Sequence, residues 1–290
     1  MKDITCIVCG NQQKIRHKLK FYVYKCPTCH LQTSDASFDL SFKSSLREDN
    51  REAGLKKLRF ANFELIQKKL IQILNNRKKQ IVGLEIGSGN GWWLKVCQEN
   101  QIDCIGIEPE DSFRKYYQEN NLNVVAGFYP NEATKSLDGY DFIIFNDVFE
   151  HISDLDSLIL NLKKDIKPNG ILIINLPIST GFFYKIAEFL GIFGIKSFLN
   201  RLWQFDFHSP HINYFNDDNL TNLLKKYNFK LLDSMRLESL DFSSIKERIM
   251  ADKKNSRLKA SIFSLGIQLL KPFILNSKPD IKVFYFCQNP

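Results

Sequence analysis

The chain has 290 residues, 44% of them hydrophobic and 25% charged. This size fits one large domain or two, and the composition excludes a wholly disordered protein. No uncharged apolar run reaches about 18 residues, so no membrane-spanning helix is expected. The net charge of +8 is uneven, because residues 1–42 carry +3, residues 43–80 carry +7 and residues 81–290 carry −2.

The beginning of the chain lacks the apolar segment of a signal peptide, so a cytoplasmic location is expected. In that compartment the seven cysteines are expected to be metal ligands or buried thiols rather than disulfides. The basic segment 43–80 has two interpretations. It is a solvated helix face, or it attracts nucleic acid or an anionic membrane.

Four cysteines lie in two pairs within residues 1–35, in the order Cys6, Cys9, Cys26 and Cys29. Two such turns bring four thiolates around one ion, and the spacing is typical of a zinc ribbon. A redox pair is the alternative, but it would need one Cys-x-x-Cys motif and not two. We therefore predict a structural Zn²⁺ site, whose four thiolates leave no position open for catalysis.

The next segment, residues 36–80, is interpreted as a basic linker followed by a helix. Residues 36–52 are polar and predicted to be irregular. Residues 53–76 have apolar residues at helical spacing, which predicts an amphipathic helix.

From residue 81 to residue 176, short apolar runs alternate with helical patterns. Strands are predicted near 81–86, 103–108, 123–127, 140–146 and 170–176, with helices over 91–100, 111–121 and 154–165. This alternation is typical of an α/β fold, with a parallel sheet covered by helices on both faces.

A glycine-rich loop follows the first of these strands. The segment from Val82 to Gly91 ends in G-x-G-x-G, where a dinucleotide fingerprint would have its third glycine one residue later. Glu85 precedes the loop, and Glu108 ends the next strand. The pattern favours a ligand without a pyrophosphate. Glu108 is expected to accept hydrogen bonds from ribose hydroxyls, or alternatively to cap the following helix.

The loop and its acids resemble the first motif and the ribose-binding acid of class I S-adenosylmethionine-dependent methyltransferases. The segments 140–152 and 167–172 are also similar to this family. The resemblance implies a Rossmann-like, seven-stranded sheet within a domain over residues 81–290, with 281–287 as an antiparallel last strand. The cofactor-binding residues expected for S-adenosylmethionine are Glu85, Gly87, Ser88, Gly89, Gly91, Glu108, Gly127, Phe128, Asn146 and Asp147.

One position departs from the family's pattern. Many members place an aspartate after the third strand to hold the adenine amino group, whereas this chain has Ala126, Gly127 and Phe128. Adenine recognition is therefore expected to use backbone groups and stacking on Phe128.

His151 follows the predicted strand 140–146, at the edge where parallel sheets bind ligands. It is a candidate base for removing a proton from the acceptor. The alternative is that it orients a loop or the cofactor. Glu150 is interpreted as structural.

Residues 177–216 are rich in aromatic residues and are predicted to form a lid over the acceptor. The closing His-x-x-Tyr-Phe, which begins at His211, resembles a bacterial subfamily of small-molecule methyltransferases. Several of its members carry an N-terminal cysteine ribbon and act on sugars. His208 and His211 are further base candidates, and the alternative role for both is hydrogen bonding that folds the lid back onto the sheet.

The remaining chain is predicted to contain a helix over 217–227, a strand over 229–238 and a basic helical stretch over 244–275. Apolar residues in the segments 182–199 and 257–275 are spaced so that they could rest on a bilayer surface. Ordinary core packing is the competing interpretation.

Our preferred interpretation is methyl transfer to a small hydroxylated metabolite, most simply a sugar or lipid-linked glycan of surface polysaccharide biosynthesis. RNA methylation is the alternative, with the ribbon and basic helix gripping RNA. Two RNA chemistries are disfavoured. Residues 146–149 lack the Pro-Pro of amino methyltransferases, and no cysteine nucleophile lies between Cys104 and Cys287. A third hypothesis is a non-catalytic cofactor sensor.

Overall fold

The computed structural model describes residues 4–39, 48–74, 80–250 and 256–289. The chain folds into two compact units, each assembled from three separate stretches. The ribbon unit comprises residues 1–61, 177–216 and 237–281, and the sheet unit comprises residues 62–176, 217–236 and 282–290. The boundaries expected from the sequence, at 1–35, 36–80 and 81–290, stay a prediction.

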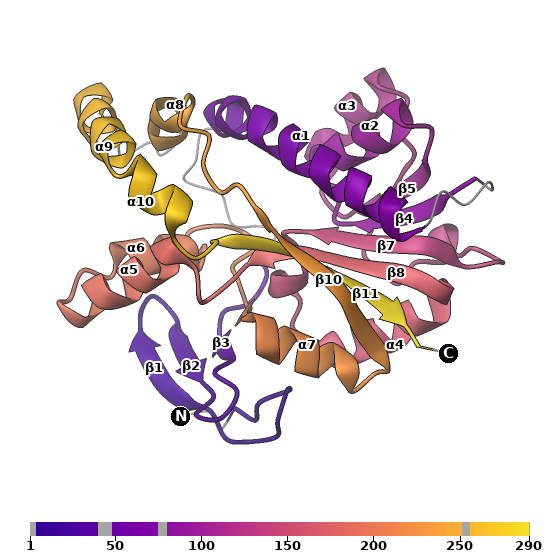
Figure 1. Cartoon of the computed structure of the whole chain (residues 1–290), viewed down its shortest axis with the longest axis horizontal. Coiled ribbons are helices and arrows are strands. Elements are labelled where there is room, and N and C mark those ends of the chain that lie inside the picture. The colour runs from indigo at the N-terminus through magenta and orange to yellow at the C-terminus, as the bar shows by residue number, and fades with distance from the viewer. Residues whose placement is uncertain (1–3, 40–47, 75–79, 251–255, 290) are drawn as a thin grey trace. The chain divides into compact units, whose positions relative to one another are not determined.

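The sheet unit is built on seven strands in the order β10-β11-β8-β7-β4-β5-β6 (Figure 1). These strands are β4 (Val82–Ile86), β5 (Asp103–Glu108), β6 (Val124–Ala126), β7 (Tyr140–Asn146), β8 (Ile166–Pro177), β10 (Phe229–Leu237) and β11 (Ile281–Gln288). Strands β6, β5, β4, β7 and β8 pair in parallel. The predicted seven-stranded sheet is confirmed, and the antiparallel direction of β11 stays a prediction.

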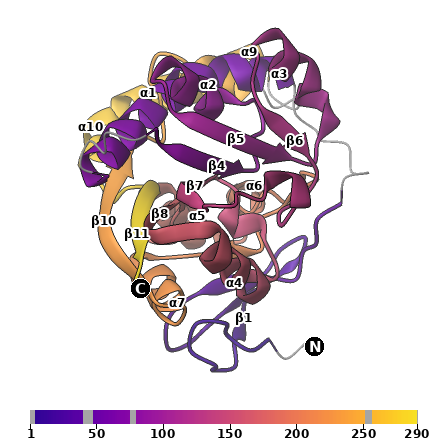
Figure 2. The ribbon, with the colours of Figure 1, turned by 90° about the vertical axis from the view of Figure 1, so that its right-hand side faces the viewer.

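Helices cover both faces of this sheet. They are α2 (Trp92–Glu99), α3 (Arg114–Glu119), α4 (Leu155–Asp165) and α7 (Asp217–Lys225), with short 3-10 turns at Asp111–Phe113, Glu132–Thr134 and Phe149–His151. Helices α2 and α3 lie on one face, and α4 and α7 lie on the other (Figures 1 and 2). This coverage explains why the central strand β7 is buried from Tyr140 to Phe145 and reads as a continuous apolar run.

Helix α1 (Glu48–Ile73) begins earlier than the sequence predicts. Residues 48–52 are helical, so the predicted irregular segment is wrong there, while 40–47 and 75–79 lie outside the described residues. The segment contains no proline, so its sequence is compatible with a helix that begins at Glu48. From Asn62 onward α1 packs on the sheet, where the Phe63 ring lies 5.8 Å from that of Trp93.

The ribbon unit contains a second sheet, in the order β1-β2-β3-β9. Its strands are β1 (Lys14–Lys18), β2 (Tyr22–Lys25), β3 (Gln32–Ser34) and β9 (Asn213–Tyr214). Strand β9 comes from the predicted lid segment and pairs antiparallel with β3, with Gln32 opposite Tyr214. The lid segment thereby forms one core with the ribbon, made of residues such as Val23, Tyr184 and Trp203.

Five helices of the ribbon unit come from the later stretches of the chain. They are α5 (Phe182–Ile192), α6 (Ser197–Leu202), α8 (Ile245–Met250), α9 (Arg257–Leu269) and α10 (Lys271–Asn276). The predicted helical stretch over 244–275 is thus divided into separate helices, with 251–255 outside the described residues. Within the described ranges, no helix is both long enough and apolar enough to cross a bilayer.

Candidate functional site

The carboxyl ends of strands β4 to β7 bring most of the predicted cofactor residues together. Strands β7, β4, β5 and β6 are neighbours in the sheet and run parallel, so their carboxyl ends meet at one edge. The glycine loop 87–91 follows β4, Glu108 ends β5, Gly127 follows β6, and Asn146 ends β7. This is the edge at which open α/β sheets bind ligands.

The glycine loop has a conformation that requires glycine. Gly87, Gly89 and Gly91 have φ angles of 76°, 48° and 70°, in the left-handed region that side chains disfavour. A Cβ on Gly87 would lie 2.5 Å from the Val148 side chain, whereas a Cβ on Gly89 would meet nothing within 4 Å. Gly87 is thus fixed by packing, and the space over Gly89 is open to a ligand.

Gly106, which the sequence analysis did not single out, leaves room for the side chain of Ser88 in the glycine loop. A Cβ at this position of β5 would lie 2.3 Å from the Ser88 hydroxyl oxygen. Ser88 of the loop therefore packs directly against strand β5. The signal was a glycine inside an apolar strand, which often marks the close approach of another backbone.

Glu108 bridges two loops. Its Oε2 accepts a hydrogen bond from the backbone N–H of Gly89 at 2.8 Å, and its Oε1 accepts one from the N–H of Glu110 at 2.9 Å. Each carboxylate oxygen keeps a second lone pair, which a ribose hydroxyl could use. The alternative of a simple helix cap is therefore incomplete, because Glu108 also fixes the glycine loop.

Glu85 is a buried carboxyl group beside this loop. Asn146 donates its Nδ2 hydrogen to Glu85 Oε1 at 2.9 Å, and Asn175 in turn donates to Asn146 Oδ1 at 3.3 Å. Burial and the nearby charge of Glu108 raise the pKa of Glu85 to about 8, against the opposing effect of the Asn146 hydrogen bond. The site would thus gain from a positive charge on its ligand. Asn175 was missed, although an asparagine in an apolar strand is its signal.

The side of the site expected to hold adenine is formed by backbone and one aromatic ring. Gly127 donates its N–H to the carbonyl of Glu108 at 3.0 Å, which ties the end of β6 to β5. Phe128 is 58% exposed, so a planar ligand can reach its ring and stack on it. Asp147, at φ 53°, turns the chain after β7.

His151 lies in the turn after β7, next to the buried Glu150. Its backbone N–H donates to the carbonyl of Val148 at 2.9 Å. Its Nε2 lies 4.0 Å from Glu150 Oε1, and the imidazole remains partly accessible, with 13% of the side chain exposed. A partly exposed imidazole beside a buried carboxylate can accept a proton from a substrate.

The two other histidine candidates belong to the ribbon unit. His211 is buried, its Nε2 lies 2.8 Å from Gln204 Nε2, and its carbonyl accepts the Ser34 hydroxyl at 2.8 Å. The His208 ring lies 6.2 Å from the Phe38 ring. Both histidines thus contact residues of the ribbon unit, Ser34 and Phe38. Their predicted roles, as bases or in hydrogen bonds that fold the lid back onto the sheet, stay predictions.

The four cysteines of the ribbon converge on one point. The Sγ atoms of Cys6 and Cys29 are 3.4 Å apart, those of Cys9 and Cys26 are 3.3 Å apart, and all four lie within 4.8 Å of one another. A tetrahedral zinc site with Zn–S bonds of about 2.3 Å needs sulfurs about 3.8 Å apart, so this donor set fits Zn²⁺. Burial raises the pKa of Cys29, whereas hydrogen bonds from the Asn11 backbone and neighbouring thiols overcome burial and lower the pKa of Cys9 to about 6.

Comparison with known proteins links the chain to methyltransferases. The family described as "Methyltransferase domain" matches residues 47–234. A ubiquinone biosynthesis O-methyltransferase of Rickettsia akari is 29% identical over 116 residues, which cover 39% of this chain and 46% of that protein. The protein of the same name from Rickettsia canadensis is 32% identical over 133 residues, covering 44% and 54%. The chain thus spans about half the length of these relatives.

Solved structures share the fold. A putative sarcosine dimethylglycine methyltransferase from Galdieria sulphuraria has a TM-score of 0.51 at 16% identity, covering 87% of this chain and 94% of that one. The plantazolicin methyltransferase BpumL, in complex with SAH, has a TM-score of 0.50 at 15% identity, covering 83% and 87%. At these sequence identities the similarity shows a shared fold only.

Proposed function

The chain belongs to the methyltransferase domain family, and from this premise we propose that it transfers the methyl group of S-adenosylmethionine to a hydroxyl oxygen of a small molecule. The family and the Rossmann-like fold expected from the sequence are both confirmed. The observation that carries the proposal is the loop 87–91, which Glu108 holds in place and which leaves open space over Gly89.

The residues at this edge fit S-adenosylmethionine. Glu108 would accept the ribose hydroxyls, the loop 87–91 would face the methionine part, and Phe128 would stack on the adenine. Glu85 is held by the neutral amide of Asn146, and no cation pairs with it among the described residues, so a positively charged ligand would favour its ionised form. When bound, S-adenosylmethionine supplies an electrophilic methyl group on a positively charged sulfur.

His151 is proposed to remove the proton from the acceptor hydroxyl. It stands after β7 on the same sheet as the cofactor residues, and Glu150 at 4.0 Å would stabilise the imidazolium that forms. His208 and His211 remain candidates for contacts with the acceptor. The hydrogen bonds of His211 to the ribbon favour a positioning role for that residue.

An oxygen acceptor is favoured by the names of the curated relatives, which are O-methyltransferases. Their names refer to ubiquinone biosynthesis, so a quinone precursor joins the sugar or lipid-linked glycan as a candidate acceptor. None of the relatives described above refers to a polysaccharide or to RNA. We therefore favour a hydroxylated molecule joined to a lipid, the property that a quinone precursor and a lipid-linked glycan share.

Peripheral membrane contact would bring the protein to such an acceptor. Large apolar side chains of the ribbon unit are exposed on α5 and on the α9–α10 pair, namely Phe189, Ile192, Phe193, Leu258, Ile262, Phe263, Leu265, Leu269 and Phe273. Arg257 and Lys271 begin these two later helices, where cations favour an anionic surface. Ordinary core packing does not account for side chains that are exposed to this extent.

The ribbon is proposed to hold a structural Zn²⁺ ion through Cys6, Cys9, Cys26 and Cys29. The convergence of the four Sγ atoms supports this proposal. Because β3 of the ribbon pairs with β9, the metal would also stabilise the segment that carries His211.

The test is transfer of labelled methyl from S-adenosylmethionine into an extract of the source cells, which is then divided into lipid, small-molecule and polymer fractions. Nuclease-resistant label in the lipid fraction supports the proposal. Mild acid then distinguishes the two acceptors, because it releases a labelled sugar from a lipid phosphate but leaves a labelled quinone precursor in the lipid fraction. Label in a polymer that disappears on nuclease treatment would establish the RNA alternative, whose binding should weaken steeply with salt. Cofactor binding without transfer would support the sensor hypothesis.

A further inference from the structure

A basic pocket lies between strand β1 and helices α5 and α6, entirely within the ribbon unit. Its volume is about 250 Å³, and it is lined by Arg16, His17, Lys18, Gly191, Ile192, Lys196 and Leu199. The lining has one arginine, two lysines and one histidine but no carboxylate. A pocket of this composition attracts an anion.

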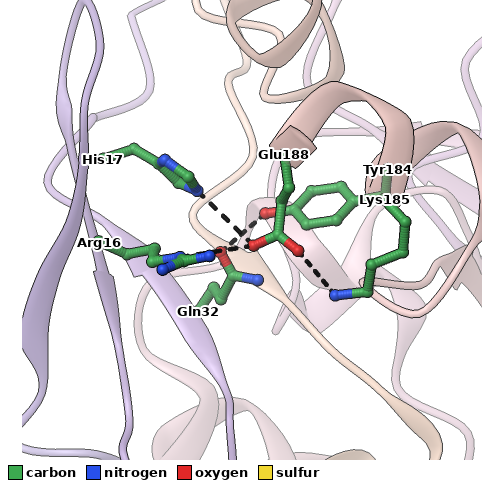
Figure 3. Close-up of polar contacts among 6 residues, drawn as sticks. All are labelled: Arg16, His17, Gln32, Tyr184, Lys185 and Glu188. Carbon is green, nitrogen blue, oxygen red and sulfur yellow. Dashed lines mark hydrogen bonds and ion pairs between the residues drawn. The ribbon is translucent and has the colours of Figure 1, made fainter. Parts of the chain in front are cut away.

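Glu188 of α5 forms ion pairs with Lys185, Arg16 and His17 (Figure 3). Lys185 of the same helix binds Glu188 Oε2 at 2.7 Å, whereas Arg16 Nε and His17 Nε2 lie 3.7 and 3.6 Å from Oε1. The last two distances are too long for hydrogen bonds. Although burial acts in the opposite direction, His17 and Lys185 hold the pKa of Glu188 down to about 2. Glu188 supplies one negative charge beside the four cations Arg16, Lys18, Lys185 and Lys196, so the pocket keeps an excess of positive charge.

His17 lines the pocket and also faces Glu188. Its side chain is 12% exposed, and its Nε2 makes no hydrogen bond within the described part of the chain, although it lies 3.6 Å from Glu188 Oε1. Leaving a buried polar nitrogen without a partner costs about 1–3 kcal/mol in general. A bound anion near Arg16 would give this nitrogen an acceptor.

The walls of the pocket are held together by hydrogen bonds between the ribbon and the helices. Lys196 Nζ donates to the carbonyl of Lys18 at 3.0 Å, and Tyr184 donates its hydroxyl to Gln32 Oε1 at 2.8 Å (Figure 3). A Cβ on Gly191 of α5 would lie 2.9 Å from the Leu199 side chain, so glycine at this position lets the buried Leu199 of α6 pack closely against α5. The site is therefore preformed, and Lys196 keeps two further N–H donors for a ligand.

We propose that this pocket binds a phosphate group. An arginine fork flanked by two lysines matches the charge and the several acceptor oxygens of a phosphate. Ile192, which is 72% exposed, adds an apolar rim. The phosphate belongs either to a lipid headgroup or to a soluble phosphorylated metabolite. This inference goes beyond methyl transfer and does not depend on it.

The experiment uses the full chain loaded with zinc and without S-adenosylmethionine. Titration calorimetry measures binding of inorganic pyrophosphate, and sedimentation measures binding to vesicles of phosphatidylcholine with and without phosphatidic acid. We expect Arg16→Gln and Lys18→Gln each to weaken binding at least tenfold and Arg16→Lys to restore part of it. Lys278→Gln, an exposed lysine of the same unit outside the lining, should leave binding unchanged.

The outcomes separate the two sources. Binding of pyrophosphate without a preference for phosphatidic acid indicates a soluble phosphate. A preference for phosphatidic acid that both glutamine variants lose, and that pyrophosphate competes away, indicates a lipid headgroup. Binding that is absent in both assays, or equal in the pocket variants and Lys278→Gln, overturns the proposal. Near-ultraviolet circular dichroism and zinc content show that each variant is folded, and retained S-adenosylhomocysteine binding separates this result from failure of the proposed methyl transfer.

Discussion

Two buried glutamates, Glu85 of the sheet unit and Glu188 of the ribbon unit, have pKa values shifted in opposite directions. Glu85 of the sheet unit is 2% exposed and Glu188 of the ribbon unit is 6% exposed. The pKa of Glu85 is raised to about 8, whereas that of Glu188 is lowered to about 2. Burial favours the neutral acid in both cases, so the difference lies in the groups around each carboxyl.

Glu188 is surrounded by cations of the protein itself, with Lys185 on its own helix and Arg16 and His17 on β1. Glu85 has a neutral amide, Asn146, and a second carboxylate, Glu108, close enough to repel its charge. The comparison teaches where to look for a ligand. Glu188 already has its cations and stabilises the fold. Glu85 has no cation paired with it in the part of the chain that the structure describes, and a bound S-adenosylmethionine would supply one.

The largest expected effect is loss of the metal, which would break the ribbon unit while sparing the sheet unit. Structural zinc contributes about 10–16 kcal/mol in small zinc domains. We expect Cys26→Ser to abolish zinc binding and to lower the thermal stability of the ribbon unit, with Cys287→Ser on β11 as control. Zinc analysis and calorimetry measure this. If the serine variant also loses S-adenosylhomocysteine binding, the two units are not independent in the way the comparison assumes.

Replacing the proposed base should have the next largest effect. Loss of a general base lowers turnover about 10²–10⁴-fold. We expect His151→Gln to reduce turnover within this range while leaving the dissociation constant of S-adenosylhomocysteine unchanged. His211→Gln should instead lower the melting temperature, because His211 is hydrogen-bonded within the ribbon unit. Equal turnover of His151→Gln and the wild type would exclude His151 as the base.

Glu108→Ala tests the cofactor site directly. It removes a charged acceptor for the ribose and releases the Gly89 N–H, and a hydrogen bond to a charged group contributes about 1.5–3 kcal/mol. We expect S-adenosylhomocysteine to bind about 10–150-fold more weakly, as measured by calorimetry. Glu99→Ala, on the exposed end of α2, is the matched control. Unchanged affinity of the Glu108 variant would contradict the assignment of this site.

Replacing each buried glutamate with glutamine tests directly whether the surroundings of Glu85 and Glu188 differ. Glu188→Gln leaves Lys185, Arg16 and His17 without their counter-charge, so we expect a loss of about 1–3 kcal/mol in the free energy of unfolding. Glu85→Gln retains an acceptor for Asn146 and is uncharged, like the protonated acid, so near pH 4.5 we expect a change below about 1 kcal/mol. Urea unfolding measures both variants. An equal loss of stability in the two would mean that their surroundings are not as different as the contacts indicate.

The smallest effects concern pH. The folded-state pKa of Glu188 is below its ordinary value, so its contribution is present above about pH 4.5 and is lost as the pH falls towards 2. The folded-state pKa of Glu85 is above its ordinary value, so stability falls as the pH rises from about 4.5 to about 8. Each slope is at most about 1.4 kcal/mol per pH unit. Urea titrations at several pH values should show the Glu85 slope disappearing in Glu85→Gln, and a persistent slope would assign it to another group.

Much of the sheet unit could be predicted because its signals are local. Three closely spaced glycines after an apolar strand require positive φ angles, and Glu108 ends the following strand, so a loop-and-acid site follows from neighbouring residues. The hydrogen-bond partners of these residues could not be predicted from the sequence. Tyr117, whose hydroxyl donates to the Gly89 carbonyl, and Asn175 come from elements that no short motif connects to the loop.

The early start of α1 shows a limit of local pattern reading. The segment 48–52 is polar, and polarity alone suggested an irregular linker. The segment contains no proline, so its sequence is equally compatible with a helix that begins at Glu48. A solvated helix turn and a polar loop have similar compositions, so hydrophobic periodicity does not distinguish them.

By itself the sequence determined the cysteine cluster, the glycine loop with its acids and the strand and helix order of the sheet unit, because each depends on residues close together in the chain. The tertiary structure decided that β9 pairs with the ribbon and that Glu188 of α5 meets Arg16 and His17 of β1. It also formed the basic pocket between β1, α5 and α6. These contacts join segments more than 150 residues apart, whose pairing depends on the packing of a shared core and leaves no spacing pattern in the sequence.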